Sequence, residues 1–169
     1  MTGTGSPTEG IGEPRAVADL AGGFILATVE VDAEPEQLFS ALTSDAVTSW
    51  LVRPGVWDTR TWESDVRPGG EWATSGVSPR GPFGITGTYQ VVESPHRLVQ
   101  TWQMALHGSA DGLPEILFDS EVEYVLSSVD AGTRLTLRHT GFSGADQCAR
   151  NCLGWETSLA ALRELFNDR

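Results

Sequence analysis

The sequence contains no lysine, and its 11 arginines are outnumbered by 23 aspartates and glutamates, so the formal net charge is −12 at pH 7. Proteins that bind nucleic acids or anionic membranes need a surplus of positive charge on one face. The deficit argues against both classes of partner, and we expect neither. The exclusive use of arginine, together with abundant alanine and 19 glycines, is typical of a GC-rich bacterial genome.

Cysteine is almost absent, because only Cys148 and Cys152 occur. They lie four residues apart in a segment with helical spacing, where a disulfide between them would strain the helix. Their spacing is not a usual zinc signature, and no convincing fourth ligand accompanies them and His139. We therefore predict two small buried apolar side chains, with no metal and no cofactor. Free thiols suit a reducing compartment, and we expect a cytoplasmic protein.

Long apolar runs and common catalytic motifs are also missing. No window approaches the ~20 apolar residues that span a bilayer. The first 20 residues contain neither the basic nor the apolar part of a secretion signal. The sequence has no Gly-x-Ser-x-Gly motif, no glycine-rich phosphate loop and no Cys-His-Asn order. Motif-based assignment to the corresponding hydrolases and phosphate-binding proteins is thereby excluded.

The chain is predicted to form one domain over residues 21–169, preceded by a flexible arm over residues 1–20 that is rich in Gly, Thr, Ser and Pro. A strand is expected over 24–31, because this segment is rich in β-branched and apolar residues. Two short helices follow, over about 35–42 and 45–51, where apolar residues recur at helical spacing.

After these helices the apolar period changes to two, which indicates β-strands. Six strands are expected, at about 56–64, 71–77, 85–93, 97–106, 116–127 and 133–140. Short turns between them indicate an antiparallel meander. A closing helix over about 145–166 carries an apolar stripe through Cys148, Trp155 and Leu162, with Gln147 and Arg150 assigned to its opposite face. The fold class is therefore α+β.

Short motifs in a fixed order support this organisation. They are Ala33, Pro35, Leu38 and Phe39, then Trp50, Arg67–Gly70 with Trp72, Pro95 with Leu98–Trp102, Gly132–Phe142, and Gly154–Trp155. In these residues the chain, over about 24–167, resembles the START-like, helix-grip proteins of the SRPBCC superfamily. Within that superfamily it is similar to the branch named after the C-terminal domain of the activator of Hsp90 ATPase.

The resemblance implies a helix-grip fold, in which a curved antiparallel sheet of six to seven strands wraps round a long C-terminal helix. Two short helices follow the first strand. It also implies an internal apolar cavity between sheet and helix. Members of the superfamily bind lipids and hormones or cyclise aromatic polyketides, so the resemblance does not select one activity.

Inward-facing residues of the expected elements give the candidate cavity lining. The candidates are Trp50, Trp62, Trp72, Trp102, Met104, Phe118, Tyr124, His139, Phe142, Trp155 and Leu159. His139 should face inward, because Arg134 and Arg138 occupy the opposite face of its strand. It is either an acid–base residue or a structural histidine that bonds a nearby backbone carbonyl. Trp57 and Trp62 differ in parity, so we expect at least one of them to face outward or toward a partner.

We therefore expect a protein that binds a hydrophobic or aromatic small molecule as a monomer or homodimer. A second hypothesis is a cyclase or dehydratase, with His139 as acid–base residue and Tyr124 or Arg60 polarising a carbonyl. A third is a protein-interaction or co-chaperone-like domain that uses exposed aromatics such as Trp57.

Overall fold

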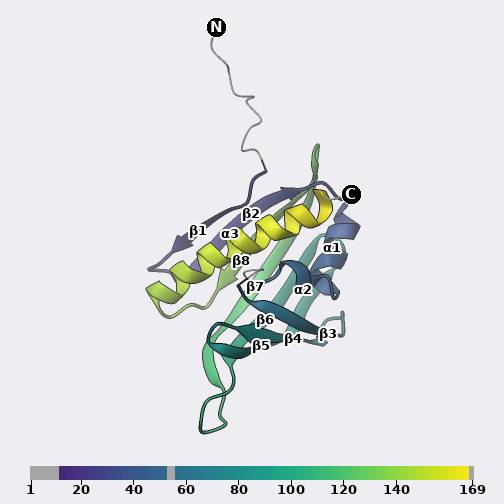
Figure 1. The fold of residues 1–169 in the computed structure, drawn as a ribbon. Helices are drawn as coiled ribbons and strands as arrows, with labels where there is room; N and C mark the ends of the chain where they lie inside the picture. Colours follow the sequence, from purple (N-terminus) through teal and green to yellow (C-terminus); the bar gives the residue numbers. More distant parts are fainter. Residues whose placement is uncertain (1–11, 53–55, 168–169) are drawn as a thin grey trace.

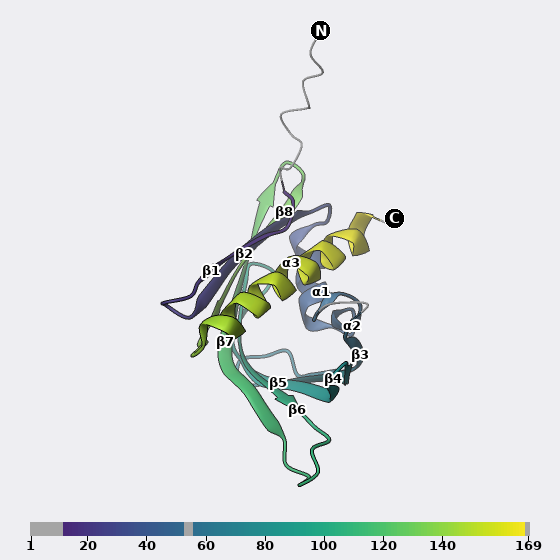
Figure 2. The same cartoon turned by 60° about the vertical axis from the view of Figure 1, so that its left-hand side comes forward.

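The structure, a computed structural model, describes residues 12–52 and 56–167, and within them one eight-stranded antiparallel sheet curves around a long helix (Figures 1 and 2). The strand order is β1-β2-β8-β7-β6-β5-β4-β3. The strands are β1 (Arg15–Asp19), β2 (Phe24–Val31), β3 (Asp58–Ser64), β4 (Glu71–Ser78), β5 (Gly81–Glu93), β6 (Arg97–Leu106), β7 (Glu115–Val129) and β8 (Gly132–Thr140). The helices are α1 (Pro35–Thr43), α2 (Val47–Trp50) and α3 (Ala145–Asn167). The α+β helix-grip class is confirmed, with one or two strands more than expected.

Helix α3 lies across the concave side of the sheet (Figure 2). Its buried residues follow steps of three, four and seven, from Cys148 through Trp155, Leu159 and Leu162 to Phe166. This is the expected stripe, except that Cys152 lies at its edge and is only half buried. None of the helices in the described part of the chain has the length and apolar character needed to cross a membrane.

The short helices α1 and α2 close one end of the sheet. At the start of α1, Glu34 donates its backbone N–H to Oε1 of Gln37 at 3.0 Å, which caps the first turn. The Trp50 indole donates to the Ala41 carbonyl at 2.8 Å and is fully buried. Trp50 therefore fastens α2 to α1 and does not face a cavity.

Strand β1 lies inside the segment for which a flexible arm was expected. It pairs antiparallel with β2 over its whole length, from Arg15 opposite Thr28 to Asp19 opposite Phe24. The Ala16 backbone N–H also donates to Oε1 of Glu156 on α3 at 3.2 Å. A short edge strand is held mainly by backbone hydrogen bonds and needs no clear alternation of apolar and polar residues. Such a strand is therefore hard to predict from the sequence. The remainder of the expected arm, residues 1–11, lies outside the described residues.

A β-bulge in β3 changes the expected orientation of two tryptophans. The register with β4 shifts between Thr59 and Thr61, so residues on the two sides of the bulge lose their simple alternation. As a result, Trp57 packs on Phe83 with ring centroids 4.8 Å apart, and Trp62 packs on Trp72 at 5.7 Å. Both rings lie against the concave face, and the expectation that one of them faces outward is wrong.

Gly87 in β5 allows close packing that no other residue permits. A Cβ atom there would lie 1.8 Å from the Thr101 carbonyl oxygen and 2.8 Å from Nε1 of Trp72. We expect Gly87→Ala to lower the free energy of unfolding by about 2–3 kcal/mol, because backbone must move. Gly84→Ala on the same strand is the control, since its nearest atom would be His107 Nε2 at 3.4 Å. Equal losses in urea unfolding of the two variants would contradict this expectation.

Candidate functional site

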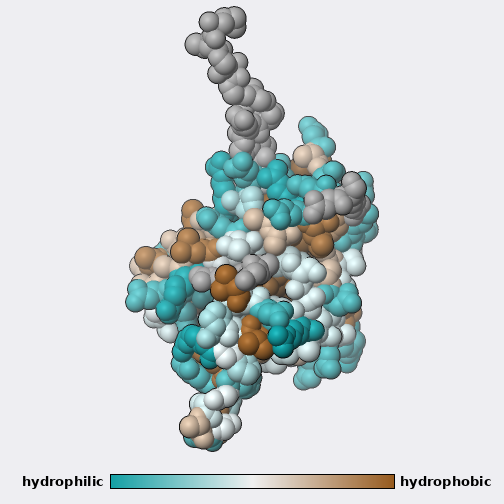
Figure 3. All heavy atoms as spheres, viewed as in Figure 1, coloured by the Kyte–Doolittle hydropathy of each residue, from teal (hydrophilic) through white to brown (hydrophobic). Residues whose placement is uncertain are grey.

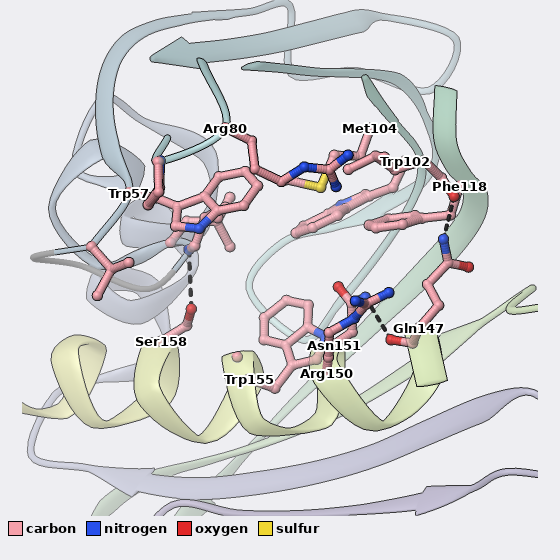
Figure 4. A pocket seen from close by; sticks show the side chains of 16 residues that line it. Trp57, Arg80, Trp102, Met104, Phe118, Gln147, Arg150, Asn151, Trp155 and Ser158 are labelled. Atoms are coloured by element: carbon pink, nitrogen blue, oxygen red, sulfur yellow. Dashed lines mark hydrogen bonds between the residues drawn. The ribbon is translucent and has the colours of Figure 1, made fainter. Parts of the chain in front are cut away.

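A cavity of about 330 Å³ opens between α3, the inner face of β6 and β7, and the β4–β5 turn (Figure 4). Four aromatic side chains line it, those of Trp57, Trp102, Phe118 and Trp155. The other lining residues are Leu51, Val52, Val56, Pro79, Arg80, Met104, Leu117, Gln147, Arg150, Asn151, Gly154 and Ser158. The lining is therefore mostly apolar, with a few polar groups concentrated on α3.

Strand alternation and helical spacing bring these side chains together. Trp102 and Met104 are two residues apart on β6 and share its inner face, and Phe118 of β7 pairs directly with Met104. Across the cavity, α3 contributes Gln147, Arg150, Asn151, Gly154, Trp155 and Ser158, at steps that keep them on one side of the helix. Regular elements thus supply two sides of the cavity, and the rest of its lining comes from the segment before β3 and from the β4–β5 turn.

The aromatic walls belong to a larger network centred on Trp102. Its ring lies 5.4 Å from Trp155, 5.7 Å from Trp72 and 5.2 Å from His139. Phe118 is edge-on to Phe142 at 5.4 Å. Edge-to-face and tilted contacts at these distances are favourable, so the rings on the cavity wall are held by a second layer of rings behind them.

Internal hydrogen bonds fix most of the polar lining residues. Ser158 Oγ accepts the Val52 backbone N–H at 3.0 Å. The Asn151 side-chain amide donates to the Gln147 carbonyl at 2.8 Å, and the Gln147 amide donates to the Leu117 carbonyl (dashed lines in Figure 4). These bonds hold the three side chains against neighbouring backbone groups.

His139 lies behind the cavity wall with both ring nitrogens engaged. Its Nδ1 accepts the Trp155 indole N–H at 3.0 Å, and its Nε2 lies 2.7 Å from Ser120 Oγ. An indole N–H can only donate, so Nδ1 carries no proton and Nε2–H donates to Ser120. The Ser120 hydroxyl in turn faces the Trp102 carbonyl at 3.3 Å. The imidazole is thus held as one neutral tautomer.

This environment argues against acid–base chemistry at His139. The side chain is completely buried and is not among the lining residues. Burial lowers its pKa from 6.5 to about 3, because the charged imidazolium would lose its hydration. The supporting groups of the enzyme hypothesis do not converge on the cavity either. Tyr124 is buried outside the lining, and Arg60 is exposed and paired with Asp58 at 2.7 Å.

The structure brings together only part of the residues that the sequence suggested. Trp102, Met104, Phe118 and Trp155 line the cavity. The other candidates are absent from its lining and pack elsewhere; they are Trp50, Trp62, Trp72, Tyr124, His139, Phe142 and Leu159. Of these, Trp72 donates its indole N–H to the Thr101 carbonyl at 3.2 Å, and Leu159 is fully buried on α3.

Several lining residues were not expected from the sequence. Gln147 and Arg150 were assigned to the face of α3 opposite its apolar stripe. Gln147 is half-buried and Arg150 is exposed, and both nevertheless line the cavity. Arg80 lies in a turn, where no periodic pattern indicates a direction. Among the described residues, no group of three or more His, Cys, Asp or Glu side chains is placed to hold a metal ion.

Comparison with known proteins agrees with the helix-grip fold described above. A family model described as "Activator of Hsp90 ATPase homolog 1-like protein" matches residues 32–167. Among solved structures, a Rhodobacter sphaeroides protein is 22% identical, with 93% of this chain and 99% of that chain covered and a TM-score of 0.70. A Chromobacterium violaceum protein is 22% identical, with coverages of 85% and 97% and a TM-score of 0.72. CalU16 from Micromonospora echinospora is 26% identical, with coverages of 91% and 84% and a TM-score of 0.60. No curated protein sequence matches.

Proposed function

We propose that this chain, which belongs to the activator of Hsp90 ATPase homolog 1-like family, binds a hydrophobic or aromatic small molecule in the cavity beside α3. The observation that carries this proposal is the cavity of about 330 Å³, whose lining includes four aromatic rings. Its volume and its mostly apolar lining are typical of small-molecule sites. Flat rings such as Trp102 and Phe118 suit a flat apolar ligand.

The arrangement favours binding over catalysis. Burial of apolar ligand surface contributes roughly 25 cal/mol per Å², so an aromatic ligand can be held without any strong polar contact. Acid–base catalysis needs an ionisable group within hydrogen-bond reach of the reacting atoms. Among the described lining residues the ionisable groups are two arginines, which remain charged at neutral pH.

The face of the molecule shown in Figure 3 gives no comparable support for a large protein partner. On the face shown in Figure 3, hydrophilic and neutral residues predominate, and hydrophobic residues form small separate groups. Large contiguous apolar patches are the usual mark of a protein-interaction surface. The exposed aromatic expected for such a role, Trp57, is instead half buried and packs edge-on against Phe83.

A neutral fluorescent probe, N-phenyl-1-naphthylamine, tests the proposal. We expect Trp57→Ala and Phe118→Ala each to raise its dissociation constant by about three- to tenfold, as loss of an aromatic contact of ~0.5–1.5 kcal/mol implies. Trp62→Ala is the matched control, because Trp62 is also half buried and packs on another aromatic ring but lies outside the lining. A Trp62 variant that loses as much affinity as the other two would contradict the assignment of the site.

A second experiment seeks the natural ligand. Native mass spectrometry of the purified protein, followed by denaturing extraction, is expected to release one discrete small molecule. Loss of that molecule from purified Phe118→Ala protein would place it in this cavity. Retention by that variant would place it elsewhere and contradict the proposal.

A further inference from the structure

The charge of the cavity lining is opposite to the charge of the whole chain. The protein has 23 acidic and 11 basic side chains. The described lining nevertheless contains Arg80 and Arg150 and no aspartate or glutamate. The charged side chains of the described lining are therefore both positive, although the protein as a whole is acidic.

The two guanidinium groups enter from opposite walls. Arg80 extends from the β4–β5 turn toward Trp102 and Met104, whereas Arg150 rises from α3 beside Asn151 (Figure 4). The Arg80 side chain is 59% exposed, and its nearest carboxylate, Glu115, lies 3.4 Å away. An exposed ion pair of this length contributes little, so a ligand anion can compete for Arg80.

A buried donor on the same cavity wall lacks an acceptor. Within the described part of the chain, Nε1 of Trp102 is buried and makes no hydrogen bond. In contrast, the indoles of Trp50, Trp72 and Trp155 all donate to an acceptor. A buried unpaired N–H is unusual in a folded protein. The unpaired donor thus belongs to a residue that lines the cavity, although the nitrogen atom itself is covered.

We infer that the ligand of this cavity carries an oxyanion, such as a carboxylate, which lies between Arg80 and Arg150 while its apolar or aromatic body packs against Trp102, Phe118 and Trp155. This inference rests on the proposed function and adds to it the chemical class of the ligand. The guanidinium groups present planar pairs of donors that match an oxyanion. The rings supply the apolar contact.

Two probes with the same ring system separate the charge from the apolar body. N-phenyl-1-naphthylamine is neutral, and 1-anilinonaphthalene-8-sulfonate carries one additional sulfonate. We measure the dissociation constants of both by fluorescence and take their ratio, neutral over anionic. The Arg80→Gln/Arg150→Gln variant is expected to lower this ratio by about tenfold, because two partly exposed ion pairs are lost.

Arg67→Gln is the matched control, because Arg67 is also exposed and paired with a carboxylate, Asp65, but lies outside the lining. It should leave the ratio within about twofold of wild type, as expected for a remote screened charge. An unchanged ratio in the double variant, or an equal drop in Arg67→Gln, would overturn the inference while leaving the proposed function standing. Binding of neither probe would overturn both.

Discussion

The free energy of unfolding of this protein is expected to fall by up to roughly 5 kcal/mol as the pH is lowered from 7 to below 3, through His139 alone. In the folded protein the pKa of His139 is about 3, against 6.5 for a free histidine. Between these values the unfolded chain binds a proton that the folded chain does not. Acid therefore favours the unfolded state, and the stabilisation, complete above pH 6.5, is lost toward pH 3.

The physical cause is the position of both imidazole nitrogens. Protonation of Nδ1 would set it against the Trp155 indole N–H, 3.0 Å away, so two donors would face each other. The surrounding rings of Trp102, Phe118 and Phe142 offer the imidazolium no carboxylate. The neutral form is thus the only one that fits the folded protein.

Urea unfolding between pH 7 and pH 4.5 measures this effect. Wild type should lose about 1.4 kcal/mol per pH unit below pH 6 from His139, in addition to the contribution of its carboxylates. His139→Gln should lose only the carboxylate contribution. Leu137→Val, at the preceding inward position of β8, is the control. It weakens the core without changing how steeply the free energy of unfolding depends on pH. Equal slopes for wild type and His139→Gln would show that the histidine is not held neutral.

Replacement of Trp155 by alanine should lower the free energy of unfolding by about 4–5 kcal/mol. Trp155 is 4% exposed, and its ring contacts Trp102, Tyr124 and His139. Its loss leaves a large void next to the cavity and removes the donor to His139 Nδ1. The variant therefore combines a packing defect with an unsatisfied buried acceptor.

Two phenylalanine variants separate these contributions. Trp102 and Trp155 are each 4% exposed, but only the Trp155 indole N–H has an acceptor. Trp155→Phe should therefore cost about 1–2 kcal/mol more than Trp102→Phe, which removes a buried donor that has no partner. Chemical unfolding of the two variants at pH 7 gives this difference directly. A greater loss for Trp102→Phe would show that its indole N–H is bonded.

Much of the fold follows from the sequence because its causes are local. The apolar steps from Cys148 to Phe166 define the buried face of α3. The inward position of His139 follows from alternation with Arg134 and Arg138. Strand β6 has the bounds expected from its apolar residues and flanking turns. In these elements, the spacing of apolar residues and the residues that form the turns are both features of short stretches of sequence.

The site is less predictable, because its causes are not local. The bulge between Thr59 and Thr61 shifts the pairing with β4, so simple alternation does not predict that Trp57, just before β3, lines the cavity. The alternation of side chains along a strand shows that Trp72 and Tyr124 face inward. It does not show whether they border the cavity or pack against other side chains. Arg80 lines the cavity from the turn between β4 and β5, where no periodic pattern indicates the direction of a side chain.

The most direct test of the binding proposal is a ¹H–¹⁵N spectrum of the six tryptophan indoles during titration with N-phenyl-1-naphthylamine. Trp57, Trp102 and Trp155 line the cavity, whereas Trp50 and Trp62 do not. We expect the indole signals of the first three to shift in a saturable manner and those of Trp50 and Trp62 to stay in place. Saturable shifts confined to Trp50 and Trp62, or no shift at all, would contradict binding in this cavity.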